Sequence, residues 1–437
     1  CVFVLFQALA GVAWVHTIGE NGTAAVAIAS AAVSIGLWIA VRPAVNPQRL
    51  PWFVLGYVAL AALSLLWSAW PGTTAVTWLL LAITTLQGLF VAAVLTWRET
   101  VAAIAAALKW VLGLSILFEL AVSLFVGGPI LPGFRIPAEK MDPIVYWSRN
   151  NLFDDGRIQG IFGNANLLAV AALLALIVFG IRYAAQAPHR LLLPAWGLLA
   201  AFLFVRAGSA TAYLSAAAVA VVLATVLLMR TVRRPGGRTV YYVVYAAVAV
   251  LAAAVLWFGR EVIFSALGRE SDLTGRLGIW ESVLERAAQH PVIGWGFATP
   301  WLPSDPMFDG WIVDHGETVM QAHNMWIDVF LQLGIVGLVL MAGIYLAFIW
   351  RSWFFAIDRP RWDLRSDRPY SPLTLLPTLV ATVLLVQGLA ESGPLLLWGW
   401  MFVVMLGFKV TQAPLVGVGP AEQSVAIERG ERVSDAA

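Results

Sequence analysis

Apolar residues dominate the sequence in runs of about 20, and short polar or charged segments separate the runs. An α-helix of this length crosses the hydrocarbon core of a bilayer, so each run is expected to span a membrane. The predicted spans are residues 1–15, 24–41, 51–69, 75–96, 101–126, 163–181, 190–205, 209–229, 239–258, 325–350, 372–390 and 394–410. The pattern therefore predicts an all-α polytopic membrane protein with about 12 transmembrane helices, and residues 1–410 form one helical bundle.

Composition supports the membrane prediction and excludes a soluble fold. Of the 437 residues, 60% are hydrophobic and only 12% are charged, whereas soluble domains contain about 25% charged residues. Many of the 21 tryptophans lie near predicted helix ends, as Trp67 and Trp97 do, and indole rings favour the headgroup region of a bilayer. A single cysteine, Cys1, excludes an internal disulfide and a thiolate metal site. The net charge of +2 gives no indication of a nucleic-acid partner.

The positions of the arginines predict how the chain lies in the membrane. One set of alternate loops contains arginines such as Arg42, Arg98 and Arg230, whereas the short loops between them, around residues 16–23, 70–74 and 391–393, contain none, and the short loop at 206–208 contains only Arg206. Because cytoplasmic loops are rich in Arg and Lys, both termini are expected in the cytoplasm, and the loops 127–162 and 259–324 outside. We therefore expect a multi-pass protein of the cytoplasmic (inner) membrane, with a disordered cytoplasmic tail at 411–437.

The long extracytoplasmic loop 259–324, between the ninth and tenth spans, is too long for a simple connection. Its residues 271–290 read as a helix that begins after Ser271 or Thr274 and ends before Pro291. An apolar stripe predicts that this helix lies on the bilayer surface. The stripe consists of Leu273, Leu277, Trp280, Leu284 and Ala287. Arg276 lies beside the stripe and is a candidate anion-binding residue, and the alternative is a solvated surface arginine.

His323 and Asn324 stand where this loop re-enters the membrane. Histidine can accept a proton at physiological pH, so His323 is a candidate general base, and the alternative is a polar cap. Arg206 precedes Gly208 and Ser209, which open the next span. An arginine beside a helix N-terminus forms a plausible phosphate site, and the alternative is an arginine that snorkels to the outer surface.

Further polar residues are predicted at the same face. Arg157 precedes the segment that opens the sixth span with Asn164 and Asn166, whose amides need partners or cap the helix. Glu119 and Glu391 lie near the outer ends of the fifth and eleventh spans, where each is expected to pair with an arginine or position a substrate. A metal cage is the alternative for four residues of the long loop, Asp314, His315, Glu317 and His323. We expect no metal and no cofactor.

Several arginines and one candidate base thus gather at the outward face, whereas the other face has only solvated basic loops. Such a site suits an amphiphile with an anionic head, for example a polyprenyl-diphosphate-linked glycan. Arginines would hold the diphosphate and stabilise the charge that grows on it as it leaves. The histidine would deprotonate the hydroxyl that attacks.

The segment HNMWIDVFLQLGIVGL, residues 323–338, resembles the signature of the O-antigen ligase and O-antigen polymerase superfamily. In that signature a His and an Asn, Ser or Gln precede nine residues and then G-x-x-G, and here these residues are His323, Asn324, Gly334 and Gly337. The sequence departs from the usual Gly, Thr or Tyr that follows, because it has Leu338. The two glycines, three apart on one helix face, are expected to permit tight helix packing. The segments RIQGIFGNANLLA and TGRLGIWESVLERAAQHPVIGWGF are also similar to family segments.

The resemblance implies a metal-independent inverting glycosyltransferase. Members of this family move or polymerise a glycan from an undecaprenyl-diphosphate carrier onto a hydroxyl of a glycan, lipid or protein acceptor. By the resemblance His323 would be the general base, and Arg206 and Arg276 would bind the diphosphate, with Arg157 as an addition. Two other classes remain: a membrane transporter of an anion or of the lipid-linked glycan, and a non-catalytic scaffold. A transporter is expected to show broken helices or charged groups near the membrane centre.

Overall fold

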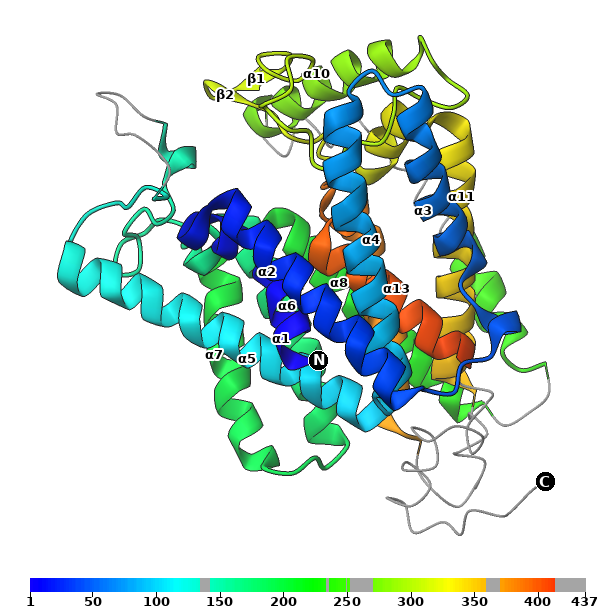
Figure 1. Cartoon of the computed structure of the whole chain (residues 1–437). Helices are drawn as coiled ribbons and strands as arrows, with labels where there is room; N and C mark the ends of the chain where they lie inside the picture. Colours follow the sequence, from blue (N-terminus) through cyan, green and yellow to red (C-terminus); the bar gives the residue numbers. More distant parts are fainter. Residues whose placement is uncertain (134–141, 233–235, 249, 252–269, 359–369, 413–437) are drawn as a thin grey trace.

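The computed structural model describes residues 1–133, 142–232, 236–248, 250–251, 270–358 and 370–412. Its elements are mainly α-helices, and β1 and β2 pair as one short antiparallel hairpin (Figure 1). The elements are α1 (Val2–Leu9), α2 (Gly11–Val41), α3 (Trp52–Leu63), α4 (Pro71–Val94), α5 (Trp97–Ala121), α6 (Ala165–Ala184), α7 (Leu193–Ala207), α8 (Ala210–Thr231), α10 (Glu270–Ala287), β1 (Val313–Asp314), β2 (Glu317–Thr318), α11 (Met325–Ile357), α12 (Leu376–Gly388) and α13 (Leu397–Gln412).

An all-α multi-pass membrane fold is confirmed. Within the described ranges, 7 helices are long and apolar enough to cross a membrane, and shorter apolar helices lie at Trp52–Leu66, Thr239–Val248 and Pro372–Gly388. The number of twelve and the membrane side of each loop stay predictions. The rest of the predicted ninth span at 252–258, the start of the long loop at 259–269 and the tail at 413–437 lie outside the described residues.

The first two predicted spans differ from the structure. α1 ends at Leu9, and α2 begins at Gly11 and continues through the predicted loop 16–23. α2 is interrupted at Gly19, whose φ of 73° is incompatible with a continuous helix. Gly19 lies within the predicted loop 16–23, so an interruption occurs where the sequence placed it, but it is a kink rather than a loop, and a further break at Ala10 separates α1 from α2.

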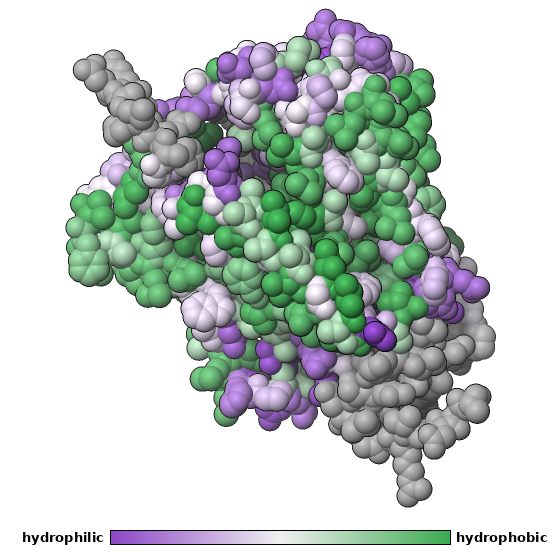
Figure 2. Space-filling view, viewed as in Figure 1, coloured by the Kyte–Doolittle hydropathy of each residue, from purple (hydrophilic) through white to green (hydrophobic). Residues whose placement is uncertain are grey.

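The surface has the polarity expected of a membrane protein. Apolar residues cover most of the middle of the molecule in the view of Figure 2, and hydrophilic residues gather mainly above and below this band. The hydrophilic upper part includes α10 and the β1–β2 hairpin of the long loop. Helices satisfy their own backbone hydrogen bonds, so they can carry this apolar surface into lipid.

α6 is the central helix of the bundle. Of its apolar window 67% is buried, against 22% for α2 and α7. α6 packs against α5 and α7, while α4 packs against α13 and α8 against α12. The side chain of Asn164 caps the start of α6 and that of Ser209 the start of α8. The polar residues predicted before these spans thus begin two neighbouring helices at one end of the bundle.

α11 is broken at Gly334, whose φ of 60° and ψ of −156° are not helical. The amides of Ile335 and Val336 would ordinarily bond to the carbonyls of Leu331 and Gln332. The segment 291–296 replaces both bonds: Trp295 and Gly296 donate to the two carbonyls at 3.0 and 2.9 Å, and Pro291 and Val292 accept from the two amides at 2.8 and 3.1 Å. All four backbone groups therefore have partners.

This arrangement explains the glycines of the two sequence motifs. A Cβ on Gly334 would lie 2.4 Å from the carbonyl carbon of Val292, and a Cβ on Gly294 would lie 2.4 Å from that of Gln332. The prediction of tight helix packing at Gly334 and Gly337 is wrong at Gly334, because Gly334 is itself the non-helical residue of α11. The close approach is real, but its partner is an extended backbone segment rather than a second helix.

The first part of α11, residues 325–333, lies between the bundle and the folded part of the long loop. Met325, Val329 and Leu333 belong to the core of the bundle. Leu331 faces a second, smaller core that also includes Trp70, Trp301 and Phe308, which we call the cap core. α10 confirms the predicted helix, and its position on a bilayer surface stays a prediction. Ile279, Val283 and Ala287 pack into the cap core, whereas Leu277 and Leu284 are exposed.

Candidate functional site

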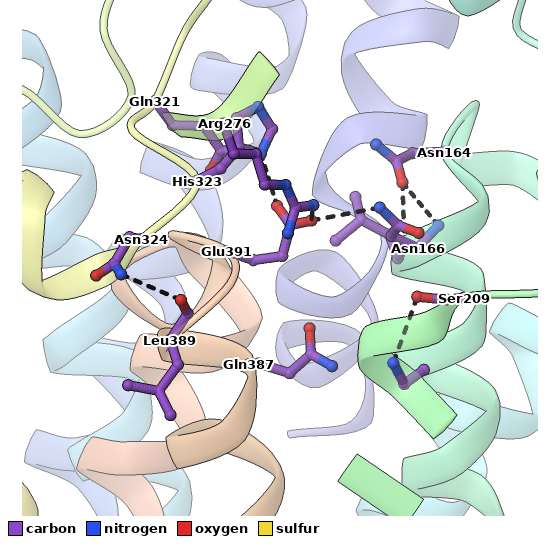
Figure 3. A network of polar contacts seen from close by, with 12 residues as sticks. Asn164, Asn166, Ser209, Arg276, Gln321, His323, Asn324, Gln387, Leu389 and Glu391 are labelled. Carbon is purple, nitrogen blue, oxygen red and sulfur yellow. Dashed lines mark hydrogen bonds and ion pairs between the residues drawn. The ribbon is translucent and has the colours of Figure 1, made fainter. Parts of the chain in front are cut away.

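The candidate site surrounds the carboxylate of Glu391, which lies in the turn after α12 and is 13% exposed. Side chains from other segments point toward it: Arg276 from α10, His323 from the residues just before α11, and Asn166 from the first turn of α6 (Figure 3). The sequence predicted each of these residues as a site residue. The structure brings them together from four separate parts of the chain.

The two oxygens of Glu391 have different partners. Oε1 accepts a hydrogen bond from the Arg276 guanidinium at 2.9 Å, and Oε2 lies 2.9 Å from Nδ1 of His323. The His323 side chain is 31% exposed and that of Arg276 is 24% exposed. The imidazole and the guanidinium therefore share one carboxylate, and both side chains remain partly exposed.

The contact with Glu391 fixes the tautomer of His323. A carboxylate can only accept, so Nδ1 carries the hydrogen and the neutral ring has its lone pair on Nε2. Gln321 also lies 3.3 Å from Nδ1, but the contact with the carboxylate is shorter and charge-assisted, and we take it as the dominant one. Nε2 is thus the atom of His323 that can accept a proton.

Asn166 extends the network to Arg157. Its amide nitrogen donates to Oε1 of Glu391 at 3.3 Å, and its amide oxygen accepts from the Arg157 guanidinium at 2.6 Å. Arg157 also donates through Nε to the carbonyl of Ala207 at 2.7 Å, at the end of α7. The exposed Arg157 is held in place between the starts of α6 and α8.

Asn164 and Asn324 cap helices, and the simpler interpretation of the sequence expected this of Asn164. The Asn164 side chain accepts from the backbone amides of Asn166 and Leu167, and that of Asn324 from Trp326 and Ile327. Asn324 also donates from its amide nitrogen to the carbonyl of Leu389 at 3.1 Å. This bond ties the start of α11 to the turn that carries Glu391.

Arg206 is not hydrogen-bonded to the Glu391 network. Its guanidinium donates to the carbonyls of Asn151 at 2.6 Å, Leu152 at 3.3 Å and Asp154. Its own carbonyl accepts from the amide of Ile158 at 3.2 Å. Arg206 therefore holds the loop that leads into Arg157, and direct contact with a diphosphate stays a prediction for this residue.

Glu119 supports the same loop from within the bundle. The residue is 1% exposed, and its carboxylate accepts from the backbone amides of Gln159 and Gly160 at 2.9 and 2.7 Å and from the Ser148 hydroxyl at 2.8 Å. The sequence suggested an arginine or a substrate as its partner. The observed partners are two backbone amides that follow Arg157 and a hydroxyl that precedes it, so Glu119 fixes the segments on both sides of Arg157.

The residues of the alternative metal cage do not come together in the described part of the chain. Asp314 pairs with His315 at 3.0 Å in the exposed hairpin, whereas His323 pairs with Glu391. Among the described residues no group of three or more His, Cys, Asp or Glu side chains has the arrangement of a metal site.

Two buried residues next to the His323–Glu391 pair were not predicted from the sequence. Asp328 and Ser392 are both buried, at 1% and 0% exposure, and the Ser392 hydroxyl donates to Asp328. The available signal was Asp328 itself, because a carboxylate within an apolar span is costly and often functional. Ser392 carried no comparable signal, since serine is common near helix ends.

Comparison with known proteins covers the part of the chain that contains His323. Residues 195–342 match the family described as O-antigen ligase, a range that includes Arg206, Arg276 and both motif glycines. The chain is 29% identical over 153 residues to the exopolysaccharide production protein ExoQ of Rhizobium meliloti (strain 1021). This alignment covers 33% of the chain and 34% of that relative, so it spans about a third of the relative's length. Together with the His-Asn-x9-G-x-x-G motif, these matches show that this part of the chain is similar to members of the O-antigen ligase superfamily.

Proposed function

We propose that the protein transfers or polymerises a glycan from an undecaprenyl-diphosphate carrier onto a hydroxyl acceptor at the outer face of the cytoplasmic membrane. The proposal is supported by the superfamily and by the name of the relative, which concerns exopolysaccharide production. The observation that carries it is the shared carboxylate of Glu391, which joins a candidate base to a candidate anion-binding arginine at 2.9 Å each.

The proposed reaction assigns one step to each group. Nε2 of His323 takes the proton of the acceptor hydroxyl while the oxygen attacks the anomeric carbon of the donor. A new carbon–oxygen bond forms as the bond from the anomeric carbon to the diphosphate breaks, and the configuration inverts. Arg276 and Arg157 stabilise the charge on the departing diphosphate. Glu391 keeps Nδ1 protonated and balances the imidazolium that forms, with no metal or cofactor in the step.

Helix ends add to the electrostatics of the site. Asn164, Ser209 and Asn324 each cap the N-terminus of a helix at this end of the bundle, and Figure 3 shows the capping bonds of Asn164 and Ser209. Helix N-termini carry a partial positive charge that favours anions. A diphosphate would therefore meet both guanidinium groups and helix dipoles, which supports an anionic carrier as the substrate.

The test is glycan profiling of cells that carry His323→Ala, with His315→Ala as the matched control. His315 is an exposed histidine of the same loop, and its only described ion pair is with Asp314. We expect His323→Ala to lose long glycan chains while the carrier-linked precursor stays intact, and His315→Ala to resemble the wild type. An unchanged glycan profile in His323→Ala would refute the proposal.

Transport is the second candidate, because interrupted helices are typical of transporters. In the described residues α2 is interrupted at Gly19 and α11 at Gly334. The gap in α11, however, is filled by segment 291–296 rather than left open to a substrate. Purified protein in detergent micelles separates the two candidates: a transferase forms glycosylated acceptor there, whereas a transporter has no second compartment and leaves the donor unchanged.

A further inference from the structure

A buried carboxylate lies behind the His323–Glu391 pair. Asp328 is on the first part of α11, in the turn that follows Asn324, and is only 1% exposed. Burial of a carboxylate is unfavourable unless hydrogen-bond donors replace the water that it loses. A leucine would fill similar space without this cost, so the donors around Asp328 indicate what the carboxylate contributes.

Two of these donors are adjacent in sequence to the members of the pair. The backbone amide of Ala322, the residue before His323, donates to Oδ2 of Asp328 at 3.0 Å. The hydroxyl of Ser392, the residue after Glu391, donates to the same oxygen. A single oxygen atom thus connects the segment that carries the imidazole with the segment that carries its carboxylate partner.

Neither segment has regular secondary structure to fix it. His323 has a left-handed φ of 50°, and Glu391 lies in the turn between α12 and the short helix Gly393–Leu395. The other side of Asp328 is also held, because Nε2 of Gln332 lies 3.5 Å from Oδ1 and Oε1 of Gln332 accepts from Ala298 and Thr299. Through Gln332 the Asp328 carboxylate is therefore linked to Ala298 and Thr299 of the long loop, while it also holds the segments that carry His323 and Glu391.

We propose that Asp328 is a positioning residue that sets the separation and orientation of His323 and Glu391 by accepting hydrogen bonds from Ala322 and Ser392. The role of Asp328 in catalysis rests on the proposed function, whereas its effect on the geometry of the His323–Glu391 pair does not rest on it. These two claims can therefore fail separately.

The experiment uses the full chain, purified in detergent, with three site variants and one control. Asp328→Leu removes both acceptor oxygens at similar volume, and Ser392→Ala removes one donor. Asp328→Asn keeps one oxygen that can still accept from both donors, so it tests rescue by a conservative change. Asp358→Asn is the control. Asp358 is also an aspartate beside α11, but it follows the C-terminal end of the helix and its side chain is 52% exposed.

With a carrier-linked glycan donor, we expect Asp328→Leu to lower kcat about 100-fold and Ser392→Ala and Asp328→Asn about 3- to 10-fold. The KM for the donor should stay within about twofold, because the anion-binding arginines are untouched. Combining Asp328→Leu with Glu391→Gln should lower kcat little beyond the larger of the two single losses, since both changes act through one pair. Additive losses, or a normal kcat per folded molecule, would overturn the inference.

A second readout needs no catalysis. The rate at which diethyl pyrocarbonate modifies His323, followed by peptide mass spectrometry, reports on the surroundings of the imidazole. We expect this rate to change at least about threefold in Ser392→Ala and in whichever Asp328 variants fold, and to be unchanged in Asp358→Asn. Equal rates in all variants would overturn the inference and leave the proposed function intact. An inactive wild type with altered labelling in the variants would refute the proposed function alone.

Discussion

Arginines occupy both ends of the bundle, but they contact different groups at each end. At the end remote from the site, Arg230 donates to the carbonyl of Ala356 and to Thr374, at 2.8 Å each. Arg238 pairs with Asp358 at 2.6 Å and donates to the carbonyl of Ile357. These arginines cap the C-terminal ends of α8 and α11, where a cation is favourable.

At the site end, Arg276 lies near the N-terminal ends of α6 and α11, where a cation is unfavourable, whereas Arg157 and Arg206 lie at the C-terminal end of α7. Arg276 is paired with Glu391, and Arg157 reaches the same carboxylate through Asn166. The comparison teaches that the number of arginines does not identify a site. An arginine placed against the helix dipole, and balanced by a carboxylate that also holds a histidine, does indicate one.

The largest contrast between the two ends is expected for Arg276→Ala against Arg238→Ala. Loss of Arg276 should lower kcat/KM about 10²- to 10³-fold, because the group faces the charge that develops on the diphosphate. Arg276→Lys should fall between, since an ammonium lacks the planar fork. Arg238→Ala should stay within about twofold in activity and lose at most about 1 kcal/mol of stability, because its partner is half exposed. Initial-rate assays measure the activity, and thermal unfolding measures the stability. Similar losses of activity in Arg276→Ala and Arg238→Ala would contradict the difference proposed between the two ends of the bundle.

A smaller and more specific effect is expected for Glu391→Gln. The amide cannot balance an imidazolium, so kcat should fall about 10- to 100-fold. The same change frees Arg276 from its ion pair, and the KM for the donor should therefore decrease. Rates measured over a range of donor concentrations separate the two parameters. A raised KM with unchanged kcat would mean that Glu391 binds substrate rather than orienting His323.

The smallest effect is expected for Arg206→Ala. Because Arg206 contacts loop carbonyls, its loss should loosen residues 151–154 and raise the KM about tenfold through Arg157, with little change in kcat. Limited proteolysis should then cut this loop faster than in the wild type. A loss as large as that of Arg276→Ala, without faster cleavage, would instead support the direct diphosphate contact that the sequence predicted.

Much of the fold was readable from the sequence because hydrophobic length is a direct physical requirement of a bilayer. The count of twelve spans stays a prediction, since α3 and α12 are short and part of the predicted ninth span lies outside the described residues. Hydropathy averages over a window and cannot register a single residue such as Gly19.

The site residues were named from the sequence, and an arginine was one of the two partners expected for Glu391, but the sharing of that carboxylate with His323 was not predicted. His323, Arg276 and Glu391 were named from residue type and position, and nothing in the sequence indicates that one carboxylate serves both cations. Arg206 looked equivalent to Arg276 because both are arginines near an outer helix end. Only the structure distinguishes an arginine that holds a loop from one that faces the candidate base.

Because of the break in α11, the folded part of the long loop cannot be removed without disturbing the bundle. A shortened chain without residues 291–296 would leave two carbonyls and two amides of a lipid-embedded helix without partners, or force Gly334 into a straight helix that moves His323. The segment precedes α11 in the chain, so it is already synthesised when α11 leaves the ribosome. Its backbone can therefore act as a template on which the final bend of α11 is set, and the position of the histidine depends on that docking.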